Sequence, residues 1–225
     1  MGATIGELLP LAVGVAVSPI PIIATILMLL APRARAASAG FATGWLVGIV
    51  VVVTVVAVIA ASADVGGTAD EPSTGASWVK LVVGALLTLL AGRQWSKRPR
   101  GDQPGSMPKW MTAIDSMTVG KSAGLGFLLA AVNPKNLLLC LSAGVTLAGS
   151  GLSGGDQVVA GAVFVVIAAS TVLVPVVGYA VAAERLRVPL DELRGWLVQN
   201  NVAVMAVLLL VIGVSLLGKG LGGLT

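Results

Sequence analysis

The chain has 225 residues, of which 56% are hydrophobic and 11% charged, and its mean hydropathy is +0.99. Soluble domains carry about 25% charged residues, so this composition excludes a soluble protein and indicates an integral membrane protein that forms one compact bundle. The net charge of +4 could suggest a nucleic-acid partner, but the positive-inside rule of membrane proteins explains the basic residues more simply.

Six apolar runs approach or exceed the length of about 20 residues that a helix needs to cross a bilayer. They cover residues 5–31, 39–61, 77–92, 122–149, 158–183 and 197–217. The third run is the shortest, but Trp78 and Trp95 flank it as interfacial tryptophans do. The sequence therefore predicts an all-α integral membrane protein with six transmembrane helices.

Charged residues divide the connections between these runs into two sets. Basic residues follow run one, separate runs three and four, and precede run six: Arg33, Arg35, Arg93, Lys97, Arg98, Arg100, Lys109, Lys121, Arg185, Arg187 and Arg194. The opposite connections hold Asp64, Asp70, Glu71 and Asp156, with Lys80 and Lys219 as the nearby cations. Because Lys and Arg favour cytoplasmic loops, we expect a multi-pass protein of the inner (plasma) membrane with both termini extracytoplasmic.

Three connections differ in composition. Residues 63–76 are rich in Gly, Asp, Ser and Thr and predict a flexible external turn. Residues 93–121 form a long basic cytoplasmic connection, in which 108–118 is either a short helix on the inner membrane surface or a loop with chance apolar spacing. Residues 184–196 mix both signs of charge and predict a solvated, internally paired loop.

A stripe of small residues marks the second run. Gly40, Gly44 and Gly48 recur every four positions, which places them on one helix face and allows a second helix to approach closely. The stripe predicts a packing face, and a homodimer interface is left open as its use.

The fourth run contains an interruption, Asn133-Pro134-Lys135-Asn136. Pro134 removes a backbone donor and frees carbonyl groups near residue 130, and such irregular backbone occurs in membranes only where protein or a wet cavity satisfies it. A charge at this depth usually faces a partner or a cavity. The alternative is a proline kink whose lysine snorkels to the interface, although Lys135 lies far from both ends of its run.

The first run has a related interruption, Ser18-Pro19-Ile20-Pro21, and Pro19 and Pro134 are offset by 115 residues. The same offset places run two on run five and run three on run six. Because each half has an odd number of runs, the halves would enter the membrane from opposite sides as an inverted repeat. We expect a first three-helix repeat at 1–92, the basic loop at 93–121, and a second repeat at 122–225.

Two broken helices that meet near the midplane would expose polar backbone to a shared cavity. The predicted substrate-binding residues are Ser18, Pro19, Pro21, Asn133, Pro134, Lys135 and Asn136. The positive charge of Lys135 favours an anion, and hydroxyl and amide groups add hydrogen bonds. Thr25 could add one more, but a contact between helices is the better interpretation for it.

The sequence argues against enzyme chemistry. There is no histidine, the single cysteine is Cys140, and every Asp and Glu lies in a connection or near the end of a run. These absences remove most catalytic dyads, zinc sites and carboxylate relays. We expect neither a metal site nor a cofactor.

The chain resembles the GAP (Sap) family of glycolipid- and peptidoglycolipid-addressing proteins, within the LysE exporter superfamily. The residues that carry the resemblance are Ser18-Pro19-Ile20-Pro21, Ala31-Pro32-Arg33-Ala34, Gly44-Trp45 and Asn133-Pro134-Lys135-Asn136-Leu137. The resemblance covers essentially the whole chain. It implies a six-helix inner-membrane protein that exports small solutes or moves cell-envelope lipids outward.

The leading hypothesis is a transporter that exports an anionic or amphipathic cell-envelope molecule, of the glycolipid or peptidoglycolipid class, through a midplane site. One alternative is an amino acid exporter of the LysE type. Another is a nontransporting accessory subunit of a lipid export machine, which would tolerate loss of Lys135. The expected partners are membrane lipids and the substrate.

Overall fold

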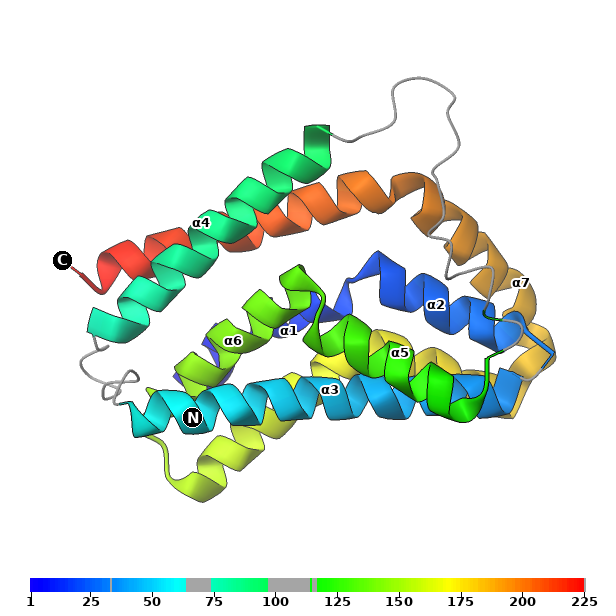
Figure 1. Ribbon diagram of the computed structural model, residues 1–225, viewed down its shortest axis with the longest axis horizontal. Helices are drawn as coiled ribbons and strands as arrows, with labels where there is room; N and C mark the ends of the chain where they lie inside the picture. The colour runs from blue at the N-terminus through cyan, green and yellow to red at the C-terminus, as the bar shows by residue number, and fades with distance from the viewer. Residues whose placement is uncertain (33, 64–73, 97–113, 115–116, 225) are drawn as a thin grey trace.

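The structure is a computed structural model that describes residues 1–32, 34–63, 74–96, 114 and 117–224. Apart from one short 3₁₀ turn at Ile114, the regular structure in these ranges consists of α-helices (Figure 1). The helices are α1 Gly2–Ala16, α2 Pro19–Leu30, α3 Ala34–Ser62, α4 Thr74–Ser96, α5 Val119–Ala131, α6 Pro134–Ala148 and α7 Gly154–Gly222. The prediction of an all-α protein is therefore confirmed for the described part of the chain.

Two of the predicted runs are broken where the prolines were expected to break them. The bend is 52° between α1 and α2, and 64° between α5 and α6. Ser18 and Asn133 precede the second helix of each pair with extended backbone, and Pro19 and Pro134 occupy the first helical turn. Proline is accommodated at this position because the first helical N–H groups have no partner within the helix.

The predicted loop at residues 184–196 is wrong, because these residues are helical and belong to α7. Glu, Leu and Arg are good helix formers, which favours helix through this segment. Arg194 pairs with Asp191 at 2.9 Å across one helical turn. The predicted pairing of charges is therefore confirmed, while the predicted loop conformation is not. A kink at Ala182, with φ −139° and ψ 49°, divides α7 into two arms. Figure 1 shows the second arm turning back toward the end of the molecule where the first arm begins.

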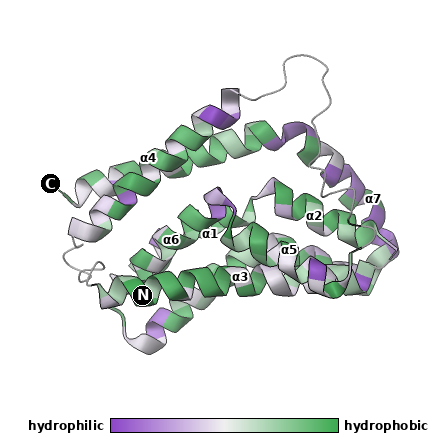
Figure 2. Cartoon of the chain, viewed as in Figure 1, coloured by the Kyte–Doolittle hydropathy of each residue, from purple (hydrophilic) through white to green (hydrophobic). Residues whose placement is uncertain are grey.

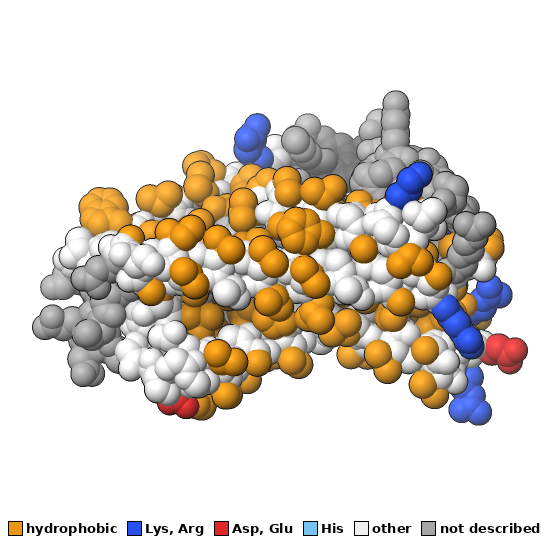
Figure 3. All heavy atoms as spheres, turned by 60° about the horizontal axis from the view of Figure 1, so that its bottom comes forward, with side chains coloured by type: hydrophobic (Ala, Val, Ile, Leu, Met, Phe, Trp, Pro, Cys, Tyr) orange, Lys and Arg blue, Asp and Glu red, His pale blue; other side chains and the backbone are white. Residues whose placement is uncertain are grey.

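Several helices are long and apolar enough to cross a membrane. The helices α3, α4 and α7 each qualify, and each bent pair adds one more candidate, which gives between three and five spans in the described chain when α7 is counted once. Hydrophobic residues run along the helices while polar residues gather at the bend of α7 (Figure 2). A space-filling view shows a face covered largely by hydrophobic side chains, with charged groups toward its edges (Figure 3). These features are typical of a multi-pass membrane protein.

The glycine stripe of the second run is a packing face within the chain. A Cβ atom added at Gly44 would collide with the backbone of Ala123 in α5, and one added at Gly126 would collide with the backbone of Phe41 in α3. The two helix backbones therefore touch, which requires residues without side chains at both positions. Because α5 covers this face, the stripe provides no support for a homodimer.

Most of the helix packing joins the amino-terminal half to the carboxyl-terminal half. Helix α3 packs on α5 and α6, α1 and α2 pack on α7, and α4 packs mainly on α7. At the end of the molecule that holds both termini (Figure 1), Glu7 accepts contacts from Lys80 at 3.2 Å and Lys219 at 3.9 Å. This cluster ties together the starts of α1 and α4 and the end of α7.

The proposed surface helix at 108–118 lies mostly outside the described residues, as does most of the basic connection. Within it, Ile114 is buried and belongs to the main hydrophobic core.

Candidate functional site

The break between α1 and α2 frees backbone carbonyl groups. The Ser18 N–H donates to the Ala16 carbonyl oxygen at 2.8 Å instead of continuing the helical pattern to Gly14. The Val17 carbonyl also has no helical partner, because the residue four positions later is Pro21, which lacks an N–H. In an apolar environment each of these groups needs another hydrogen-bond donor.

Lys135 supplies donors to this end of α1. Its side chain is buried, with 3% exposure, and Nζ donates to the Gly14 oxygen at 2.6 Å and to the Val17 oxygen at 3.3 Å. Thr171, in the first arm of α7, donates its hydroxyl to the Ala16 oxygen at 2.7 Å. The alternative in which Lys135 snorkels to an interface is therefore wrong. The amine is held among carbonyl oxygens at a helix carboxyl terminus, where a cation also complements the helix dipole.

The two breaks are joined by a second set of hydrogen bonds. Ser18 Oγ donates to Asn136 Oδ1 at 2.9 Å, and Asn136 Nδ2 donates to the Leu129 carbonyl oxygen at 3.0 Å. Asn133 Oδ1 accepts from the Lys135 backbone N–H at 3.2 Å and so caps α6. Leu129 is among the last carbonyls of α5, which agrees with the expectation that Pro134 frees groups near residue 130.

The structure thus brings the residues of the two predicted motifs together. Ser18 and Asn136 are joined by a hydrogen bond. Asn133, Pro134 and Lys135 lie at the α5–α6 break, where Asn133 caps α6 by accepting from the Lys135 backbone N–H. Pro19 and Pro21 contribute because neither has a backbone N–H, so the carbonyl groups four residues before them have no helical donor. Thr25 is different, because its hydroxyl donates to the Pro21 carbonyl oxygen within its own helix at 2.8 Å.

A cavity of about 310 Å³, which we call the polar pocket, adjoins this junction. Its lining residues come from α4, the α5–α6 break and the second arm of α7: Leu90, Arg93, Gln94, Asn133, Pro134, Lys135, Met205 and Leu209. Two of these described residues are cationic and none is acidic. Among the described carboxylates none pairs with Arg93 or Lys135.

The sequence did not lead us to place Arg93 and Gln94 beside Asn133, Pro134 and Lys135, although all five line the polar pocket. Arg93 directly follows the third apolar run and is one of the positive charges that assign the following connection to the cytoplasm. Nothing in its local sequence distinguishes it from the other basic residues there, since its place in the pocket depends on how α4 crosses α7. Thr171 carried a weak signal as a hydroxyl within an apolar run.

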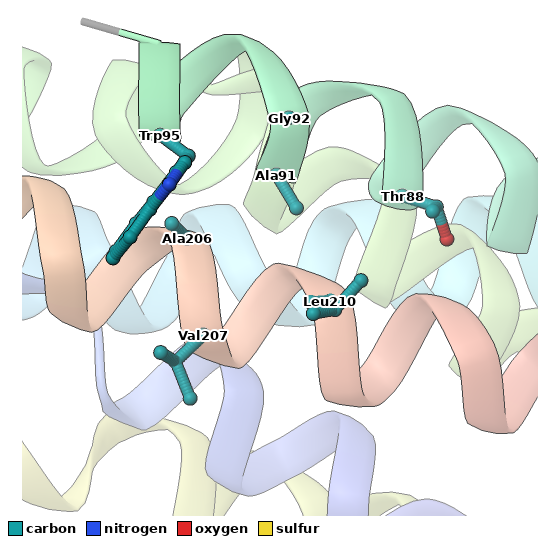
Figure 4. Close-up of a pocket in the computed structure, with 7 residues that line it drawn as sticks. All are labelled: Thr88, Ala91, Gly92, Trp95, Ala206, Val207 and Leu210. Atoms are coloured by element: carbon teal, nitrogen blue, oxygen red, sulfur yellow. The ribbon is translucent and has the colours of Figure 1, made fainter. Parts of the chain in front are cut away.

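A second cavity, which we call the apolar pocket, lies between α4 and the second arm of α7 and has a volume of about 480 Å³. Thr88, Ala91, Gly92, Trp95, Ala206, Val207 and Leu210 line it (Figure 4). Figure 4 shows the Trp95 side chain reaching from α4 toward α7 beside Ala206. Trp95, Val207 and Leu210 are each about half exposed, at 48%, 56% and 48%, so the pocket opens at the outer surface of the bundle.

Asn201 carries a further polar group and lies close in the sequence to Met205, which lines the polar pocket. The Asn201 Oδ1 atom is buried without a hydrogen-bond partner, and Asn201 precedes Met205 by one helical turn on the same face of α7.

This arrangement is suited to binding an anion. A cationic pocket with amide groups can hold an oxyanion. The described residues contain no cluster of His, Cys, Asp and Glu that could hold a metal ion.

Comparison with known proteins identifies the family. Residues 8–222 match the family model described as Sap, sulfolipid-1-addressing protein. The match covers nearly the whole chain, so the chain belongs to this family, as the sequence resemblance predicted. The family indicates a membrane protein related to transport rather than a known class of enzyme. No curated protein and no solved structure matches the chain.

Proposed function

We propose that this member of the Sap family moves an anionic, amphipathic cell-envelope lipid across the inner membrane, with the head group held in the polar pocket. The observation that carries the proposal is that Arg93 and Lys135 line one pocket beside two broken helices, with no acidic residue in the lining. An anion is the ligand that two cations and two amides would select.

The two cations have different roles in this proposal. Lys135 already donates to two carbonyl oxygens, so it fixes the junction and offers its remaining donor to the ligand. Arg93 has a planar guanidinium that matches the geometry of oxyanions such as sulfate and phosphate. The family is named for a sulfolipid, a lipid that bears a sulfur oxyanion. Gln94 and Asn133 would hydrogen-bond the neighbouring polar atoms of the head group.

We further propose that the chain is an inverted repeat of two three-helix halves, 1–92 and 122–225, joined by the basic connection at 93–121. In support, Ser18 and Asn133, and Pro19 and Pro134, occupy equivalent places in the two breaks. If each arm of α7 crosses the membrane, the arms correspond to α3 and α4 and the chain has six spans. Rocking of one half against the other would then expose the site alternately to the two sides.

The polar pocket is proposed to face the cytoplasm in this structure. Arg93 and Gln94 lie near the end of α4 that leads into the basic connection, which the positive-inside rule assigns to the cytoplasm. At the other end of the molecule, the contacts of Glu7 with Lys80 and Lys219 would close the outer side. Both termini are extracytoplasmic in this arrangement.

An amino acid exporter fits the polar pocket less well. A free amino acid carries an ammonium as well as a carboxylate, and the pocket lining contains no acidic residue to pair with the ammonium. The apolar pocket that opens at the bundle surface also suits a lipid better than a small polar solute. An accessory subunit without a transport site would not need the cations of the polar pocket.

The test is complementation of a deletion strain, with surface lipids profiled by mass spectrometry. Arg93→Gln is the informative variant, because Arg93 is exposed and its loss leaves no buried group unpaired. Arg185→Gln is the matched control, since Arg185 is also an exposed cation but lies outside the polar pocket. We expect Arg93→Gln to lose surface delivery of an anionic lipid at normal membrane abundance, while Arg185→Gln restores it. Full rescue by Arg93→Gln would overturn the proposal in favour of an accessory role.

A further inference from the structure

The polar and apolar pockets lie on different faces of the same helix pair. With 3.6 residues per turn, Leu90, Arg93 and Gln94 project from one face of α4. The residues of α4 that line the apolar pocket, Ala91 and Trp95 among them, project from the opposite face. On α7 the linings also alternate, with Met205 in the polar pocket and Ala206 in the apolar one.

Small residues lie where α4 and α7 separate the two pockets. Ala91 and Ala206 are buried, with 3% and 4% exposure. Gly92 is exposed, and an added Cβ atom there would meet no other atom within 4 Å, so the apolar pocket is open beside this turn of α4. A chain that passed between the helices at this point would require α4 and the second arm of α7 to move apart, since both alanines are buried where the helices pack.

We propose that the apolar pocket holds an acyl chain of the same lipid whose head group occupies the polar pocket, and that this chain passes between α4 and the second arm of α7. The inference rests on the proposed function, since it assigns the tail of that substrate. The occupant is a substrate-linked chain because a cationic pocket and an apolar pocket that opens at the outer surface lie on opposite sides of one helix pair. An amphiphile has this same order of groups.

The energetics explain what the apolar pocket would contribute. Moving a chain from bilayer to pocket gains no hydrophobic free energy, because lipid tails are as apolar as the pocket lining. Selectivity must therefore come from the head group, while the apolar pocket fixes where the chain lies. The chain of an ordinary membrane lipid with a neutral head group should occupy the apolar pocket only in proportion to the concentration of that lipid in the bilayer.

Trp95 provides a reporter inside the apolar pocket. The purified protein is reconstituted into zwitterionic vesicles with a low mole fraction of a sulfate-headed amphiphile that has a brominated chain, which quenches nearby tryptophan fluorescence. The same brominated chain on a zwitterionic head group is the comparison. The quenching of Trp95 is obtained as the difference in quenched fluorescence between the parent protein and Trp95→Phe. Trp78→Phe is the matched control, because Trp78 is exposed on the other end of the same helix.

We expect the sulfate-headed amphiphile to quench Trp95 severalfold more than the zwitterionic one, and to quench Trp78 equally with either. Arg93→Gln should remove the preference at Trp95. Gly92→Leu, which places a side chain in the open space of the apolar pocket, should also remove it, whereas Val211→Phe on the exposed surface of α7 should not. Equal quenching of Trp95 by both amphiphiles would overturn the inference.

The outcome separates this inference from the proposed function. If Arg93→Gln abolishes surface delivery but Trp95 shows no preference, the head-group site stands and the chain lies elsewhere. If Trp95 shows the preference but Arg93→Gln still delivers the lipid, the pocket binds the amphiphile without being its transport site.

Discussion

The α1–α2 break and the α5–α6 break both interrupt a helix just before a proline, but they satisfy the freed backbone groups differently. At the α5–α6 break, residues nearby in the sequence satisfy the backbone groups, because Asn133 caps α6 and Asn136 donates to the Leu129 oxygen. After α1, the donors come from distant parts of the chain, Lys135 and Thr171. The second break is largely self-sufficient, whereas the first depends on it.

The two cations of the polar pocket, Lys135 and Arg93, differ in whether the protein itself already binds them. The carboxyl terminus of α1 carries a partial negative charge that attracts the Lys135 amine, so a substrate anion would share Lys135 with the protein. Arg93 has no such competitor among the described carboxylates. Loss of Lys135 should therefore disturb folding and transport together, while loss of Arg93 should disturb transport alone.

The largest effect is expected from Lys135→Met. The substitution keeps an apolar side chain of similar length but leaves the Gly14 and Val17 oxygens buried without that donor. Leaving a buried acceptor unpaired costs about 1–3 kcal/mol, so we expect unfolding in SDS to shift by about 3 kcal/mol or more. Lys135→Arg, which retains donors, should recover part of the loss. An unchanged SDS midpoint for Lys135→Met would show that the first break does not depend on Lys135.

A smaller effect is expected from Asn136→Leu, which removes the hydrogen bonds with Ser18 and Leu129. We expect a loss of about 2 kcal/mol, because one buried carbonyl and one hydroxyl lose their partner. The measurement is again the free energy of unfolding in SDS. A loss as large as that of Lys135→Met would mean that the second break is no more self-sufficient than the first.

Thr171→Val should cost about 1 kcal/mol, since it removes one donor to the Ala16 oxygen. Ser170→Ala is the matched control, because the Ser170 hydroxyl donates to Ile167 in its own helix and contacts neither break. Equal losses for the two variants, measured by thermal unfolding in detergent, would contradict a role for α7 in satisfying the first break.

The smallest effect is expected from Ser18→Ala, at about 0.6 kcal/mol, the average measured for hydrogen bonds between membrane helices. A double-mutant cycle with Asn136→Leu would isolate the Ser18–Asn136 hydrogen bond. We expect a coupling energy close to the single loss from Ser18→Ala. A coupling near zero would mean that the two breaks are linked only through Lys135.

The sequence predicted the broken helices well because proline acts through local covalent geometry. Pro19 and Pro134 break the helices at the expected residues, and the charge of Lys135 marked it as a residue that needs a partner. The partner itself was not predictable, because backbone carbonyls carry no sequence signal. The same limit applies to Arg93, whose place in the polar pocket depends on the crossing of α4 and α7. Helix continuity through residues 184–196 was missed because charge density was taken to indicate a loop.

The packing of each half against the other bears on how the chain is made. Gly14 and Lys135 are 121 residues apart, and ribosomes add roughly 5–20 residues per second, so the end of α1 waits on the order of ten seconds for its donor. During that time α3 also lacks α5, the helix that covers its glycine stripe. The nascent first half must therefore keep its exposed carbonyls near water, lipid head groups or an insertion factor until α6 is synthesised. A chain truncated before residue 119 would remain in that unfinished state and become a substrate for membrane proteases.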